Sequence, residues 1–287
     1  MKDLTICIPT YNRDPFLQWT LDKTRTEFPG QKIIVSDNGK STLNFDGIRY
    51  IRQSPNIGPF PNLRAVLLAA STKYCVFLAD DDYLLPDEVQ KGLDFMEAHP
   101  EVLVYYAPCQ LYDEIQHVAN WEAFYVAEDR TFTRADELWN FVMHNHVWPE
   151  HAIYRRAGLA VILQPRSQVY WCFTDLANAA LRGPIHFAKK PYYRNLTGHP
   201  VGGRVKLGDQ QCLTDFDSYR WGLEVLAHDI FRGALASSEA LELKANVNNM
   251  IRQFIWSRYE VAVRIHTANG RLGDADLLRK RMDMTKY

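Results

Sequence analysis

The chain has 287 residues, of which 47% are apolar and 23% charged, and its formal net charge is −1. This composition is typical of a globular protein and excludes the broad positive surface that binds nucleic acid. No stretch resembles a signal peptide or is long enough to span a bilayer, and the five cysteines lack CxxC spacing. We therefore expect a cytoplasmic protein with reduced cysteines.

The first part of the chain alternates short apolar runs with helical patterns. Strands are predicted at residues 3–8, 31–37 and 48–53, and helices at residues 15–27 and 63–73. Asp14 suits the cap of the first helix and Pro15 its first turn. Alternation of this kind predicts a mainly parallel sheet with helices on both faces, whose strands end at one rim.

A further buried strand, residues 74–78, is followed by three consecutive carboxylates, Asp80, Asp81 and Asp82. Adjacent carboxylates repel one another, so a cation or several hydrogen-bond donors must neutralise them, and hard divalent cations prefer such oxygen ligands. The alternative is a helix start, in which Asp82 or residues 86–88 cap a helix that begins near Leu85.

Four segments of this beginning carry a resemblance. ICIPTYNR, VSDNG, NIG followed by NLRAVLLAA, and FLADDDYLLPDEV resemble, in order and spacing, the family-2 glycosyltransferases, which are nucleotide-sugar-dependent enzymes of the GT-A fold. The resemblance implies an α/β fold of the GT-A (Rossmann-like) type: a mixed, mainly parallel sheet flanked by helices. It also implies a nucleotide diphosphate sugar as donor, with UDP favoured, and a divalent metal, Mn²⁺ or Mg²⁺.

The same resemblance assigns site residues. The donor nucleotide is expected to contact Pro9, Thr10, Tyr11, Arg13, Asp37, Asn38, Asn56, Arg64, Asp80 and Asp81. The metal is expected at Asp80, Asp82 and His199. Many relatives read DADD where this chain reads ADDD, which leaves open whether Asp81 or Asp82 touches the metal.

Each of these assignments has a structural alternative. Asp37 begins Asp-Asn-Gly, which is a strong Asx-turn sequence by itself. Arg64 could lie on a solvated helix face, and Tyr11 could pack against the first helix. Because the chain has neither a GxxxxGK[ST] nor a GxGxxG motif, phosphate recognition must come from the metal and arginine.

The middle of the chain is rich in aromatic and β-branched residues. Strands, some of them antiparallel, are predicted within residues 101–114, 121–129 and 151–158, and a helix capped by Thr133 is predicted at residues 133–145. The nearby histidines, His144, His146 and His151, lack the spacing of a zinc site.

Residues 168–195 carry the candidate catalytic base. Thr174 or Asp175 is predicted to begin a helix that ends at Gly183, with two strands after it. The segment resembles the one in which an acid opens a helix and acts as the base of inverting family members, and Asp175 occupies that place. A carboxylate suits this role because a sugar hydroxyl must lose its proton during attack. The alternative is a plain N-cap, and Thr174 stands where relatives often have Glu.

Aromatic residues and a glycine-rich segment complete the expected site. Trp148, Tyr170 and Trp171 are candidates for contacting the acceptor, with core packing as the alternative. Residues 196–204 could form a lid over the donor, in which His199 contacts metal or diphosphate and Arg204 clamps phosphate; an ordinary linker is the alternative.

The last part of the chain is helical, with helices predicted at residues 215–235, 237–270 and 273–284. An apolar face is expected to pack on the main domain or a second subunit, and it comprises Leu241, Val247, Ile251, Phe254, Ile255, Tyr259 and Val263. Arg279, Lys280 and Arg281 could touch an acidic membrane surface, although a solvated basic end is favoured.

The predicted domains are a GT-A domain at 1–205 and a helical region at 206–287. The first divides into a nucleotide-sugar half, 1–107, and an acceptor half, 108–205.

The sequence thus predicts a metal-dependent inverting glycosyltransferase that acts on a glycan or lipid-linked acceptor, by analogy in surface polysaccharide assembly. It is expected in the cytoplasm, either free or peripheral at the inner face of the plasma membrane. A sugar-phosphate nucleotidyltransferase and an inactive nucleotide- or carbohydrate-binding module are the alternatives.

Overall fold

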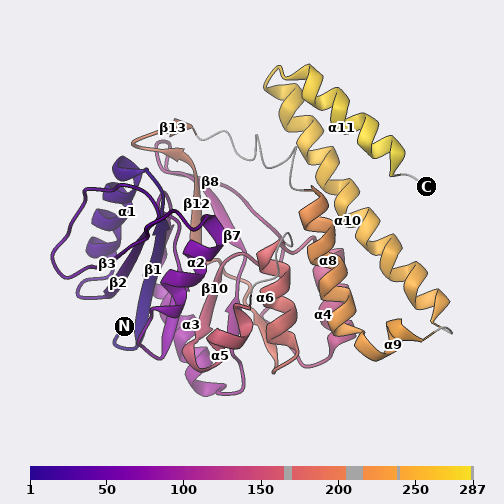
Figure 1. The fold of residues 1–287 in the computed structure, drawn as a ribbon, viewed down its shortest axis with the longest axis horizontal. Coiled ribbons are helices and arrows are strands. Elements are labelled where there is room, and N and C mark those ends of the chain that lie inside the picture. The colour runs from indigo at the N-terminus through magenta and orange to yellow at the C-terminus, as the bar shows by residue number, and fades with distance from the viewer. Residues whose placement is uncertain (165–169, 205–215, 238–239, 286–287) are drawn as a thin grey trace.

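A computed structural model describes residues 1–164, 170–204, 216–237 and 240–285 (Figure 1). Within these residues a large mixed sheet forms the centre of the molecule. Its eight strands lie in the spatial order β3 (Arg49–Arg52), β2 (Lys32–Asp37), β1 (Leu4–Thr10), β4 (Tyr74–Phe77), β10 (Ala152–Arg155), β6 (Val104–Tyr106), β11 (Ile185–Phe187) and β9 (Arg130–Phe132). The first four are parallel, and β10 and β9 run antiparallel to their neighbours, as the predicted fold class requires.

A second, smaller sheet lies beside the first. It contains β13 (Gly203–Arg204), β12 (Tyr193–His199), β7 (Cys109–Asp113), β8 (Val118–Glu122) and the short β5 (Tyr83–Leu84), which pairs with β12. The stretch 101–114 therefore supplies strands to two sheets, and the break between them contains Pro108, which has no amide hydrogen to donate.

The strand predicted at 121–129 is mostly wrong. Only Trp121 and Glu122 belong to a strand, and the residues after them run irregularly toward β9. Phe124 and Val126 in this stretch are buried in the core. The alternation of apolar residues therefore reflects burial of their side chains, whereas the backbone of residues 123–129 belongs to neither sheet.

Helices cover both faces of the large sheet. The helices of the described residues are α1 (Asp14–Glu27), α2 (Pro59–Leu68), α3 (Pro86–Ala98), α4 (Ala135–His144), α5 (Arg156–Ile162), α6 (Trp171–Ala180), α8 (Phe216–Ile230), α9 (Arg232–Ala236), α10 (Leu241–Ala268) and α11 (Leu272–Met284), of which α11 packs on α10. Buried residues of α1 and α3 share one core cluster with β1, β2 and β4, whereas those of α2, α4 and α6 belong to the cluster that reaches α8 and α10.

Several predicted helix starts are corrected. Asp14 lies inside α1 and Arg13 holds the cap position, while Arg134 rather than Thr133 precedes α4. Leu85 precedes α3, so Asp82 is not its cap. The helix predicted to start at Thr174 or Asp175 begins at Trp171, which excludes the N-cap alternative for Asp175.

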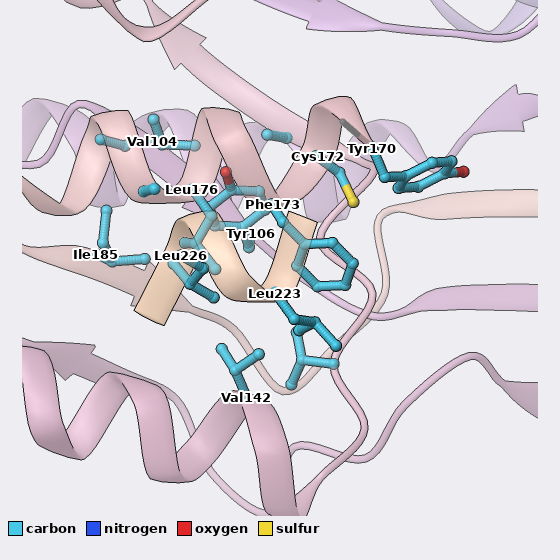
Figure 2. Packing of buried hydrophobic residues seen from close by; sticks show 14 of the residues in the cluster. Val104, Tyr106, Val142, Tyr170, Cys172, Phe173, Leu176, Ile185, Leu223 and Leu226 are labelled. Carbon is cyan, nitrogen blue, oxygen red and sulfur yellow. The ribbon is translucent and has the colours of Figure 1, made fainter. Parts of the chain in front are cut away.

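The C-terminal helices pack onto the main domain. Phe173 and Leu176 of α6 meet Leu223 and Leu226 of α8 beside Val104 of the large sheet (Figure 2). The predicted apolar face of α10 is buried from Val247 to Tyr259, but Leu241 is 72% exposed because it lies in the first turn, beyond the packed part of the helix. In the described part of the chain, none of the helices combines the length and hydropathy needed to cross a membrane.

Candidate active site

A cavity of about 400 Å³ opens where β1, β2 and β4 end. It is lined by Pro9, Thr10, Tyr11, Arg13, Asn38, Asn56, Gly58, Pro59, Asn62 and Asp80. Seven of these were expected to contact a nucleotide, whereas the expected residues Asp37, Arg64 and Asp81 are not part of the lining. Tyr11 is 53% exposed at the cavity.

Asp80 is the acid that faces this cavity. Its carboxylate accepts hydrogen bonds from the Thr10 hydroxyl at 2.6 Å and from Arg13 at 3.0 Å. Thr20 of α1 donates to the backbone carbonyl of the same residue. Burial raises the pKa of the Asp80 carboxyl to about 6, although Arg13 and Thr10 oppose the rise. Asp80 thus joins β1, α1 and the rim of the cavity.

Asp81 is the most accessible of the three acids. Its side chain is 20% exposed and its carboxylate accepts a 2.6 Å hydrogen bond from the second guanidinium nitrogen of Arg13. Arg13 therefore bridges Asp80 and Asp81, and it lies over the ring of Phe16 at 4.5 Å. The guanidinium is the cation that neutralises these two acids here.

Asp82 has a different role. It is 2% exposed, and its carboxylate accepts hydrogen bonds from the Tyr193 hydroxyl, the Asn195 amide and the backbone N–H of Leu196, at 2.8, 3.1 and 2.8 Å. Burial, followed by the charge of Asp81, raises the pKa of this carboxyl to about 8, and the three donors oppose the rise. Asp82 consequently anchors β12 to the end of β4.

The loop after β2 is fixed by Asp37 and Asn38. Asp37 accepts hydrogen bonds from the backbone N–H groups of Gly39 and Ser41, which is the Asx-turn geometry of the alternative interpretation. Asn38 donates to Asn56 at 2.7 Å and accepts from Ile57 N–H at 2.8 Å. Asp37 thus shapes the turn, while Asn38 and Asn56 close one wall of the cavity.

Asn62 was missed by the sequence analysis. It is 3% exposed and its side chain accepts from the Ser36 hydroxyl and donates to the backbone carbonyls of Thr10 and Ser36. One amide therefore ties α2 to β1 and β2 at the cavity floor. The sequence analysis placed Asn62 in the loop before the helix predicted at 63–73, whereas the helix begins at Pro59 and buries the amide, which must then find partners.

Asp175 lies within α6, is 5% exposed, and is not part of the cavity lining. No described residue donates a hydrogen bond to its carboxylate. Burial raises the pKa of this carboxyl well above its usual range, and the charge of Arg64 on α2 opposes the rise. Arg64 therefore lies close to Asp175 from α2. Its Nη1 is buried, so the alternative position on a solvated helix face is wrong.

Further polar groups around Asp175 have no partner within the described residues. They are Nη1 of Arg64 and the hydroxyls of Tyr106, Tyr154 and Thr174. Burial, and then the charge of Asp175, raises the pKa of both tyrosine hydroxyls, so these groups lie close to the carboxylate. Buried unpaired donors are costly and are expected to bind water or substrate.

The aromatic residues expected to contact an acceptor are largely packed. Trp148 lies between the rings of Tyr170 and Phe254, at 5.5 and 5.8 Å, with Arg258 4.7 Å from its ring centre. Tyr170 is 7% exposed. Trp171 contacts Phe77 edge-on, which places the start of α6 beside the end of β4.

Glu150, which the sequence analysis did not single out, lies at the same rim. It lies two residues before β10, and because β10 runs antiparallel to β4, the start of β10 lies at the end of β4. Its carboxylate is only partly exposed and accepts a hydrogen bond from the Tyr170 hydroxyl. Burial raises its pKa, while Tyr170 and the charge of Arg258 oppose the rise.

His199 lies at the end of β12 and is fully buried against the rings of Phe16 and Trp19. Its Nδ1 accepts a hydrogen bond from Val201 N–H, and Nε2 has no partner within the described part of the chain. Burial lowers its pKa, which favours the neutral ring, and Asp81 is close enough to oppose that effect. The side chain of Arg204, a predicted phosphate clamp, lies outside the described residues.

No cluster of three or more His, Cys, Asp or Glu groups suited to a metal occurs among the residues that the structure describes. The predicted set of Asp80, Asp82 and His199 is therefore not assembled as a three-residue site. His144, His146 and His151 likewise form no such cluster within this part of the chain.

The sequence pattern described as Glycosyl transferase family 2 matches residues 5–162. An uncharacterized protein of Mycobacterium tuberculosis is 29% identical over 122 residues, which cover 38% of this chain and 35% of that protein. The abequosyltransferase RfbV of Salmonella typhimurium is 27% identical over 114 residues, 34% of each chain. The matched part spans about a third of the length of these curated relatives.

Solved structures are similar over nearly the whole chain. TarS 1–349 of S. aureus is 17% identical, with a TM-score of 0.55 and coverage of 99% of this chain and 92% of that one. The complex of TarS 1–349 with UDP-GlcNAc is 15% identical, with a TM-score of 0.56 and coverage of 99% of this chain and 93% of that one. The mannosyltransferase PcManGT of Pyrobaculum calidifontis, in complex with GDP-Man and Mn²⁺, is 14% identical. Its TM-score is 0.52, and the match covers 99% of this chain and 81% of that one. Likeness at these identities establishes the GT-A-like fold.

Proposed function

The chain belongs to glycosyl transferase family 2, because the sequence pattern of that family matches more than half of it. On that premise, we propose that the protein transfers a sugar, with inversion, from a nucleotide diphosphate sugar to a hydroxyl of a glycan or lipid-linked acceptor. The observation that carries the proposal is the cavity at the ends of β1 and β2, which is bordered by Arg13 and Asp80. Family membership favours sugar transfer over the nucleotidyltransferase alternative.

The donor nucleotide is proposed to occupy this cavity. Its volume of about 400 Å³ suits a small molecule of this class. Thr10, Tyr11, Asn38 and Asn56 supply hydrogen-bonding groups and one exposed ring, and Arg13 supplies positive charge. Structures with a similar fold contain UDP, UDP-GlcNAc or GDP-Man, which supports a nucleotide sugar as the donor, with uridine favoured.

A divalent cation fits the residues on the diphosphate side of the triplet. Asp81 is partly exposed, and His199 has a buried, unpaired Nε2 within electrostatic reach of it. We assign the cation to Asp81 rather than to Asp82, whose carboxylate already accepts three hydrogen bonds from β12. Because Nδ1 of His199 accepts from Val201 N–H, its neutral ring carries the proton on Nε2, which would donate to a diphosphate oxygen. Mg²⁺ and Mn²⁺ commonly take one or two protein ligands and complete their shell with phosphate and water. When bound, the cation would neutralise charge on the departing diphosphate.

Asp175 is proposed as the general base. Its carboxylate has no hydrogen-bonded partner among the described residues, and Arg64 is the charge that favours its ionised form. In the reaction, Asp175 would take the proton of the acceptor hydroxyl as that oxygen bonds to the anomeric carbon, and the bond from that carbon to the diphosphate would break. One displacement of this kind inverts the anomeric configuration.

The test uses Asp175→Asn with Glu150→Gln as the matched variant, because both remove a partly or fully buried carboxylate near the start of α6. Asp175→Asn is expected to lower the transfer rate by about a hundred-fold or more. Calorimetric binding of UDP with Mn²⁺ should stay within about two-fold of wild type, since the base does not touch the nucleotide.

Three outcomes separate the possibilities. Transfer that survives Asp175→Asn but is lost in Glu150→Gln would move the base to Glu150. Binding of UDP or GDP without transfer from UDP-GlcNAc or GDP-Man would support the inactive binding module instead. A wild-type protein that binds neither nucleotide, with or without Mn²⁺, would contradict the proposed function.

A further inference from the structure

The ring of Trp121, on β8, is 61% exposed. β8 is the last strand of the smaller sheet's main path, and each of its five residues is exposed. An exposed tryptophan on such a strand leaves much apolar surface in water and is typical of a contact surface. The aromatic residues that the sequence favoured as acceptor contacts are, in contrast, mostly packed.

The strand register connects Trp121 to the triplet. Trp121 pairs with Leu111 of β7, and Leu111 pairs with Asn195 of β12, so the three side chains lie on one face of the sheet. Asn195 donates to Asp82 from that face. Neighbouring strands lie about 4.8 Å apart, which places Trp121 roughly 10 Å across the sheet from Asn195.

Two irregularities in the sheet add polar groups to this place. The register shifts in β8 at Asn120 and in β12 at Thr197, and each shift leaves one extra residue. The Asn120 amide donates to the Thr197 hydroxyl at 2.8 Å, across β7. Bulges of this kind re-aim side chains and are common beside active sites. An exposed amide therefore lies one position before Trp121 on β8, hydrogen-bonded to a partly exposed hydroxyl on β12.

We propose that Trp121 and the Asn120–Thr197 pair form a subsite for one pyranose ring of the acceptor glycan. This inference rests on the proposed function, because it places the acceptor beside the triplet on the side away from the nucleotide cavity. A pyranose has an apolar C–H face, which packs on a flat aromatic ring, and hydroxyl groups at its edge, which pair with amides and hydroxyls. The three side chains offer both kinds of contact.

Position also favours a glycan over another occupant. Asp80 lines the cavity and Asp82 holds β12, so the triplet separates the nucleotide side from the Trp121 side. β12, β7 and β8 are neighbouring strands (Figure 1), and Asn195, Leu111 and Trp121 occupy paired positions across them. A second copy of this chain pairing along β8 is the competing occupant.

The experiment compares Trp121→Ala and Trp121→Phe with Trp221→Ala. Trp221 is 48% exposed on α8 and is the matched control, because it removes a similar exposed ring elsewhere. Transfer from UDP-GlcNAc, UDP-glucose and GDP-Man is measured with methyl glycosides and trisaccharides of common hexoses as acceptors. UDP binding is measured by calorimetry and oligomeric state by light scattering.

Trp121→Ala is expected to raise the acceptor KM about ten-fold or more, with UDP affinity within about two-fold. Trp121→Phe should recover most of the loss, and Trp221→Ala should match wild type. An unchanged acceptor KM in Trp121→Ala, or a dimer that this substitution dissociates, overturns the subsite while leaving the proposed function intact. Failure of wild type to bind nucleotide or transfer any sugar overturns both.

Discussion

At the scale of single residues, three adjacent aspartates have three different environments. Asp80 faces the cavity and pairs with Thr10 and Arg13, Asp81 is the accessible acid, and Asp82 is enclosed by donors from β12. Their environments differ because the chain turns between β4 and β5, which aims successive side chains in different directions. Burial therefore acts on Asp80 and Asp82 far more than on Asp81.

The titration of Asp80 predicts a measurable pH dependence of stability. Its pKa of about 6 in the folded protein exceeds its ordinary value of 3.8. Between these values the folded state keeps a proton that the unfolded state has released, so the free energy of unfolding falls as pH rises from about 4 to 6 and levels off above 6. The difference corresponds to about 3 kcal/mol.

Urea unfolding at several pH values checks this prediction. Asp80→Asn should remove this part of the pH dependence, so that the variant gains stability relative to wild type as pH rises from 4 to 7. Asp87→Asn, at an exposed position in the first turn of α3, is the control and should follow wild type at each pH. Parallel curves for wild type and Asp80→Asn would contradict the expectation.

Residue roles were predictable from the sequence only in part. Seven of the expected nucleotide contacts line the cavity because they follow strand ends, and strand ends can be read from the apolar pattern. The bonding of Asp82 could not be read this way, because its partners lie more than a hundred positions later, on β12. Trp148 shows the same limit, since Phe254 and Arg258 enclose it from a distant helix.

At the scale of elements, the contact between α6 and α8 determines where Asp175 lies. Gly222 of α8 faces Phe173 of α6, and a Cβ at position 222 would lie 2.8 Å from a ring carbon and 3.3 Å from the Tyr170 carbonyl oxygen. The Phe173 ring is fully buried and has little room to move. The helices approach this closely because residue 222 lacks a side chain.

Gly222→Ala is expected to destabilise the protein by about 1–3 kcal/mol, because the added methyl group overpacks this contact. Gly233→Ala is the matched control, since Gly233 is also helical and a Cβ there would meet no atom within 4 Å. That substitution should stabilise by about 0.5–1 kcal/mol through helix propensity. Chemical denaturation measures both, and a neutral Gly222→Ala would show that the helices can separate without cost.

Element boundaries were less predictable than element types. Helix α6 begins at Trp171, before the polar residues that a capping rule selects, because Trp171 packs against Phe77 and Cys172 is buried in the core. Tertiary packing thus determines where the first turn of α6 begins. At α1, α2, α3, α4 and α6, the side chain of the N-cap residue makes no capping hydrogen bond. Local rules of propensity do not contain that information.

At the scale of the whole molecule, one apolar cluster joins the sheet to the C-terminal helices. Val104 of β6, Phe173 of α6, Leu223 of α8 and Phe254 of α10 belong to it. The division into domains at about residue 205 remains a prediction, although this cluster crosses it. A shared core favours cooperative unfolding of the described helices together with the sheet.

We therefore expect a single unfolding transition, with near- and far-ultraviolet circular dichroism giving coincident curves. Phe254→Ala should lower stability by about 3–5 kcal/mol and shift both curves equally, since its ring packs on Trp148 and Phe173 of the main domain. Separate midpoints for the two signals would indicate that the helical region unfolds by itself.

The enclosure of Asp82 by β12 also affects how loss-of-function experiments on the triplet can be interpreted. Alanine at this position would leave Tyr193, Asn195 and the Leu196 amide without their shared acceptor and would release the strand that bears His199. An inactive Asp82 variant would thus mimic a missing metal ligand while reporting a displaced strand. Of the three acids, Asp81 is the one whose substitution would test the proposed ion coordination without removing an acceptor of β12, provided that the effect on its partner Arg13 is measured in parallel.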